Sequence, residues 1–71
     1  MNNIMNKFKI GDIVNIVGLR QYENETMKIL NFILVIDTDK YKYFYSGTNL
    51  EDKYYIFDIS EEHLALSTQG V

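Results

Sequence analysis

The sequence predicts a small all-β domain, and three observations support this fold class. Apolar and polar residues alternate at 12–17 and again at 40–46, which is the period-two pattern of a strand. An apolar stretch rich in Ile, Val and Phe occupies 27–37. Short polar stretches built from Gly, Asp, Thr and Asn separate these segments, as turns do. The 71 residues suffice for one such domain.

The first strand is expected at about 12–17, after a turn at Gly11-Asp12 that uses the backbone freedom of glycine. The polar stretch 18–26 is expected to be a long loop. Residues 27–37 are too apolar for a strand with one face in water. They predict a strand buried on both faces or one that bends across a barrel. A short helix is the competing interpretation, which the Ile, Val and Phe content disfavours.

The second half of the chain predicts a turn, a loop and three further strands. Ser60 can cap a single helical turn, and the acidic residues that follow suit the positive end of a helix. The turn is expected at 37–40, the strands at 40–46, 53–58 and 64–66, and the loop at 46–52. The expected organisation is a flexible N-terminus at 1–7, one domain at 8–67 and a C-terminal tail at 68–71.

The alternating apolar positions define the expected core. The stretch 27–37 carries more apolar side chains than one inward face can bury. Its surplus face is therefore expected either to form a homodimer surface or to pack under the loop 18–26. The predicted core residues are Phe8, Ile10, Val14, Ile16, Ile29, Phe32, Leu34, Tyr43, Tyr45, Ile56, Leu64 and Leu66.

Two sequence patterns resemble those of the small SH3-like barrels of bacterial and phage proteins. Gly11-Asp12 with Val14 and Ile16 matches the first-strand pattern GDxVxI, and residues 61–66 match EExLxL at Glu61, Glu62, Leu64 and Leu66. The resemblance covers about 8–67. It implies five short antiparallel strands in a barrel, with one helical turn before the last. It implies no particular activity, and the missing tryptophan and proline argue against binding of proline-rich peptides.

Composition excludes several classes of protein. The chain has no cysteine and one histidine, too few ligands for the usual structural zinc sites, and we expect no metal and no cofactor. The absence of cysteine favours a reducing compartment, so a cytoplasmic location is expected. The longest apolar run, 32–36, is far shorter than the roughly 20 residues of a membrane span. We therefore expect no membrane partner.

No constellation of residues predicts catalysis, so an enzyme is not expected. His63 is the only histidine and stands in a run with Glu61 and Glu62, whose side chains point in different directions. Asp37 and Asp39 flank the expected turn, where carboxylates are usually solvated. The four glycines are scattered, which does not match a phosphate-binding loop.

The aromatic residues indicate a binding surface. Six tyrosines and four phenylalanines exceed what one small core needs. Tyr43 and Tyr45 are expected to fill the core, whereas other aromatics would be exposed beside acidic residues, as in a protein interface. We therefore expect a non-enzymatic protein-binding module, by analogy a phage-encoded inhibitor or adaptor that binds a host protein in the manner of anti-defence proteins. The expected contact residues are Asp39, Lys40, Tyr41, Lys42, Glu51, Asp52, Tyr54 and Tyr55.

The alternative is a small barrel that binds nucleic acid through residues 40–55. Tyr41, Tyr54 or Tyr55 would stack on bases, while Lys40, Lys42 and Lys53 would contact phosphates. The net charge of −3 and the acidic residues around these lysines argue against a coherent positive face. A protein partner is therefore the first expectation, and nucleic acid the second.

Overall fold

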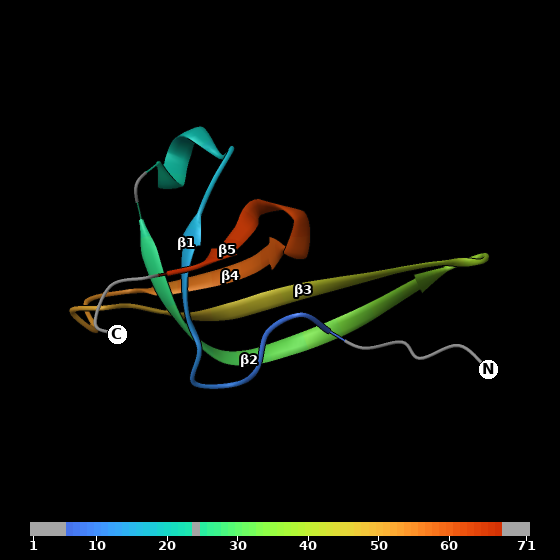
Figure 1. The fold of residues 1–71 in the computed structure, drawn as a ribbon, viewed down its shortest axis with the longest axis horizontal. Helices are drawn as coiled ribbons and strands as arrows, with labels where there is room; N and C mark the ends of the chain where they lie inside the picture. Colours follow the sequence, from blue (N-terminus) through green and yellow to red (C-terminus); the bar gives the residue numbers. More distant parts are fainter. Residues whose placement is uncertain (1–5, 24, 68–71) are drawn as a thin grey trace.

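The computed structural model describes residues 6–23 and 25–67, and it confirms an all-β fold. Five strands form one antiparallel sheet in the order β4-β3-β2-β1-β5 (Figure 1). Within the described ranges, β4 and β5 are the edges of this sheet and do not pair with each other. The strands are β1 (Ile13–Ile16), β2 (Thr26–Asp37), β3 (Lys40–Asn49), β4 (Tyr55–Ser60) and β5 (Leu64–Leu66), and two 3-10 turns are η1 (Arg20–Tyr22) and η2 (Glu61–His63).

The strand positions follow the sequence pattern with two departures, the first being that β4 spans 55–60 instead of the expected 53–58. The loop expected at 46–52 is wrong in its first half, because β3 continues to Asn49. Gly47 and Thr48 suggested a break, yet Gly47 is a strand residue that lies against β2. A Cβ atom at Gly47 would stand 1.8 Å from the carbonyl oxygen of Lys28, so only glycine fits there. The single helical turn expected before the last strand is the 3-10 turn η2.

Among residues 6–23 and 25–67, nine buried apolar residues form the core. Tyr45 is fully buried among them, and its ring meets the ring of Phe8 edge-on with centroids 5.5 Å apart. Seven of the nine were expected from the sequence; Met27 and Ile59 were not. Phe32 and Tyr43, also expected in the core, are partly buried against it. The core residues are Phe8, Val14, Ile16, Met27, Ile29, Tyr45, Ile56, Ile59 and Leu64.

Three residues expected in the core are exposed instead. Ile10 lies in the turn before β1 and is 61% exposed, and Leu66 lies on the edge strand β5 and is 60% exposed. Leu34 is 37% exposed because it stands on a part of β2 that has left the core. The alternation of apolar residues does not by itself indicate whether a neighbouring element covers a given side chain.

Two β-bulges shape the sheet. The pairing of β2 with β3 shifts between Ile29 and Asn31, and that of β3 with β4 shifts between Tyr45 and Gly47. A bulge bends its strand and increases its twist. The near half of the β2–β3 pair thus curls over the core, while the far half continues away from it.

The far half of this hairpin, residues 30–43, is called the arm below. β1 pairs with β2 only at 26–28, whereas β2 and β3 stay paired as far as Asp37 and Lys40. A two-residue turn, Thr38-Asp39, closes the arm. Figure 1 shows the arm extending beyond the other strands to its tip, which accounts for the elongated shape of 38 × 26 × 18 Å.

The ends of the chain are described only in part. The expected tail at 68–71 and most of the expected N-terminal segment 1–7 lie outside the described residues. Lys7 is described, and its backbone N–H donates to the carboxylate of Glu61 at 2.9 Å.

Candidate binding surfaces

The eight residues expected to form one site lie at two ends of the molecule. Asp39, Lys40, Tyr41 and Lys42 are at the tip of the arm, and the others are in or next to the β3–β4 loop at the opposite end (Figure 1). β3 separates the two groups, and a ten-residue strand spans about 30 Å. The sequence suggested a single site because residues 40–55 are close along the chain. The structure divides them into two surfaces.

The first surface is the arm, which is apolar on both faces. On one face Leu34 stands opposite Tyr43 and Ile36 opposite Tyr41; on the other, Ile33 stands opposite Phe44, the residue that follows the arm. Six of the arm's large apolar side chains are between 37% and 59% exposed. Such a concentration of exposed apolar residues is typical of an interface. The six are Leu30, Ile33, Leu34, Val35, Ile36 and Tyr41.

The charges of the arm do not form a basic face. Two aspartates at 37 and 39 balance two lysines at 40 and 42. Lys42 also lies 3.9 Å from the carboxylate of Glu62 and 5.9 Å from the centre of the Phe44 ring. The expected lysine surface is therefore neutralised by the aspartates and by η2.

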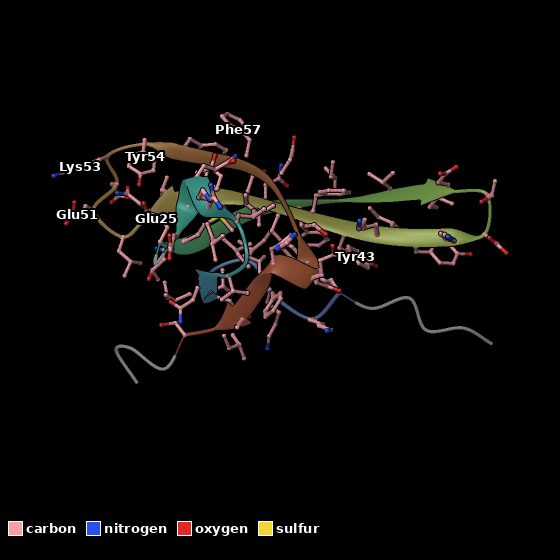
Figure 2. All side chains as sticks on the ribbon, turned by 90° about the horizontal axis from the view of Figure 1, so that it is seen from above. Glu25, Tyr43, Glu51, Lys53, Tyr54 and Phe57 are labelled. Carbon is pink, nitrogen blue, oxygen red and sulfur yellow. The ribbon has the colours of Figure 1, made fainter. Side chains whose placement is uncertain are left out.

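The second surface is called the acidic end and consists of Glu25, Glu51 and Tyr54, which lie at one end of the molecule in Figure 2, and of Asp52 from the same β3–β4 loop as Glu51. The Tyr54 hydroxyl donates to the carboxylate of Glu25, and this hydrogen bond is the main cause that raises the pKa of Tyr54. Tyr54, Glu25 and Glu51 line a shallow open hollow together with residues from β2 and β3. Tyr54 and Glu51 were expected as contact residues, whereas Glu25, from a segment distant in sequence, was not.

The β3–β4 loop that carries the acidic end is fixed by hydrogen bonds. The side-chain oxygen of Asn49 accepts the backbone N–H of Lys53 at 2.7 Å, and Thr48 donates to Asp52 at 3.1 Å. Lys53 in turn lies 3.2 Å from the carboxylate of Glu51. The carboxylates of Glu51 and Asp52 are therefore presented by an organised turn.

An exposed aromatic pair extends from the acidic end along β4. The rings of Tyr55 and Phe57 have centroids 4.6 Å apart, and the residues are 40% and 65% exposed. Figure 2 shows Phe57 projecting away from the sheet, on the side opposite Tyr43. Tyr55 was expected as a contact residue. Phe57 was not, although its two-residue spacing from Tyr55 placed both on one face of the strand.

Two other titratable groups have structural roles. The buried Tyr45 hydroxyl donates to the Glu61 carboxylate, and burial, followed by this hydrogen bond, raises the pKa of Tyr45 well above its ordinary value. His63 donates from Nδ1 to the carbonyl oxygen of Val17 at 2.9 Å.

Over residues 6–23 and 25–67, no three acidic, histidine or cysteine side chains gather as a metal site would require. The same ranges contain no helix with the length and apolarity needed to cross a membrane.

Comparison with known proteins gives no relative: no family model, no curated protein and no solved structure matches this chain.

Proposed function

We propose that the protein is a non-enzymatic protein-binding module that contacts a basic protein surface. The observation that carries this proposal is the exposed ring pair of Tyr55 and Phe57 beside the carboxylates of the acidic end. Aromatic residues dominate the centres of protein interfaces, and polar residues form the rims. In this assignment the ring pair is the anchor, and the acidic end is the rim.

The charge of the rim sets the chemistry of the partner. Glu25, Glu51 and Asp52 contribute three carboxylates against the one ammonium group of Lys53, which lies 3.2 Å from Glu51, so the rim keeps a net negative charge. A positive partner surface is attracted to such a rim, and a negative one is repelled. An arginine-rich or lysine-rich protein surface is the best match.

The finer parts of the proposal rest on resemblance. The Gly11-Asp12 turn and the 3-10 turn before β5 support a place among small SH3-like barrels. The proposed role is a cytoplasmic inhibitor or adaptor, phage-encoded and of the anti-defence type. An acidic module of this kind would block the basic site of a host protein that itself binds nucleic acid.

The nucleic-acid alternative has less support. Lys40 and Lys42 are at the tip of the arm, whereas Lys53 is at the opposite end of the molecule. Lys42 and Lys53 both lie near glutamates. Binding driven by release of counterions needs several cations on one continuous surface, which these lysines do not provide.

The test is a pull-down with the tagged full-length chain from host lysate, with and without nuclease. We expect one stoichiometric protein that survives nuclease and is lost with Tyr55→Ala, Phe57→Ala and Glu51→Lys. Leu66→Ala is the control for the aromatic changes, because Leu66 is similarly exposed on another edge. Asp39→Lys is the control for the charge change, because it makes the same reversal on the arm.

Two results would contradict the proposal. Nucleic acid in the eluate, with its proteins lost after nuclease treatment, would favour the alternative. Binding that is unaffected by the three variants would place the interface elsewhere on the molecule.

A further inference from the structure

The arm has an unpaired strand edge. Residues 31–37 of β2 pair with β3 on one side, and no strand in the described part of the chain pairs with their other side. On that side β1 reaches only residues 26–28, and the backbone of Ile29 is bonded to Gly11 and Asp12. The free edge therefore begins just after Ile29 and ends at the turn.

This edge lacks the features that normally keep an exposed edge from pairing. Monomeric proteins protect such edges with charged residues, prolines or short strands. The edge here carries the uninterrupted apolar run 32–36 and has no proline and no charge before Asp37. A two-stranded hairpin is also only marginally stable in water by itself. Both facts indicate that the edge is covered in the functional protein.

We propose that a second copy of this chain covers the edge, with the two β2 strands paired antiparallel about a two-fold axis at Leu34. Residues directly opposite each other in an antiparallel pair point to the same face. A two-fold axis perpendicular to the sheet keeps every side chain on its own face. One residue must therefore lie at the axis, opposite the same residue of the other copy. Leu34 is the midpoint of the free edge 31–37, so this choice pairs the whole edge.

The resulting contacts suit a self-complementary interface. Ile33 would face Val35 of the other copy, and Phe32 would face Ile36. Asp37 would face the Asn31 side chain, whose amide can donate to the carboxylate. No two like charges face each other, and the four charges near the tip sum to zero. Electrostatic repulsion between the two arms therefore does not oppose their self-association.

The proposed dimer is of modest strength. The six exposed apolar side chains of the arm are divided between its two faces and its two strands, so edge-to-edge pairing covers only part of their surface. A standard interface buries about 800 Å² per partner, and pairing of the edges buries less than that. The backbone hydrogen bonds of the paired edges add to the apolar contacts. This dimer would place the two acidic ends far apart and make the module bivalent.

The chain contains no cysteine, which permits a direct test of the proposed register. Leu34→Cys introduces one thiol per copy, opposite its own copy, and opposed residues lie within disulfide range. With oxidised glutathione we expect the covalent dimer to form at least about tenfold faster than with Phe57→Cys, because paired thiols have a high effective concentration. Equal rates for the two variants would overturn the proposal.

A second pair of variants tests the interface without relying on the disulfide. Val35→Asp places a carboxylate opposite Ile33 of the other copy, whereas Val17→Asp makes the same change at a similarly exposed position outside the arm. By light scattering we expect the unmodified chain and Val17→Asp to be dimers and Val35→Asp to be a folded monomer. The proposal would be overturned if the Val35→Asp variant were a dimer. It would also be overturned if the unmodified chain were a monomer, and that result would indicate a different occupant for the edge. The three variants expected to abolish pull-down, Tyr55→Ala, Phe57→Ala and Glu51→Lys, lie outside the arm, so the two proposals can fail separately.

Discussion

Tyr45 connects the core to the 3-10 turn η2. Its ring is fully buried, and its hydroxyl donates to Glu61, which also accepts the backbone N–H of Lys7. One carboxylate thereby joins three segments that are distant in the sequence. Because the phenolate would have to be desolvated beside this carboxylate, the folded protein holds Tyr45 in its neutral form.

Removing the hydroxyl should destabilise the fold at neutral pH. We expect Tyr45→Phe to lower the free energy of unfolding by about 1–2 kcal/mol, because the Glu61 carboxylate loses a buried donor. The pH dependence should also change. The pKa of Tyr45 is raised in the folded state above the ordinary value of 10.0, so the associated stability is fully present below that pH and is lost progressively as the pH rises from there toward the raised pKa of the folded state.

Urea denaturation at neutral pH and at about pH 11 measures both effects. The unmodified chain should lose stability at alkaline pH, and Tyr45→Phe should lose less. Tyr22→Phe serves as a control for alkaline effects common to the tyrosines. Identical losses in all three proteins would show that the Tyr45 hydroxyl is not the alkaline-sensitive group.

At the scale of elements, local sequence patterns were sufficient to predict the strands but not the arm. The period-two alternation and the turn residues located all five strands, because these signals depend on neighbours in the chain. Where β2 leaves the core depends on the length of its partners, and β1 has only four residues. Both faces of 27–37 are apolar, so the sequence did not distinguish a buried Leu34 from an exposed one.

The candidate site was predictable in its residue types but not in its arrangement. Exposed tyrosines beside carboxylates were expected, and Tyr54 and Tyr55 are exposed. The ten-residue length of β3 separated the two halves of the expected site. The contact of Glu25 with Tyr54 joins positions that are far apart in sequence, and no local pattern indicates such a pairing.

The turn at the tip should limit the stability of the arm. Thr38 has a left-handed φ of 56°, which is unfavourable for a β-branched residue and favourable for glycine. We expect Thr38→Gly to stabilise the arm by about 1 kcal/mol and to slow amide exchange at 33–37. The neighbouring turn residue Asp39 does not have a left-handed φ, so glycine relieves no strain there. Asp39→Gly is therefore the matched control. Faster exchange in Thr38→Gly, or equal slowing in the control, would contradict this account of the turn.

The whole molecule is elongated, with different binding chemistry at its two ends. One end carries carboxylates and an aromatic pair, and the other carries a neutral apolar arm with a free strand edge. The proposed functions follow this separation: the acidic end binds a basic protein, and the arm binds a second copy of the chain. Long-range repulsion from the net charge of −3 is modest, because the charges near the arm tip cancel.

The most direct measurement is amide hydrogen exchange of the unmodified chain at low and at high protein concentration. A strand edge paired between copies becomes protected only when the dimer is populated. The account predicts that protection at 31–37 rises with concentration, whereas protection at 55–60, on the edge strand β4, stays constant. Exchange at 31–37 that is independent of concentration, or protection that appears at β4 instead, would contradict it.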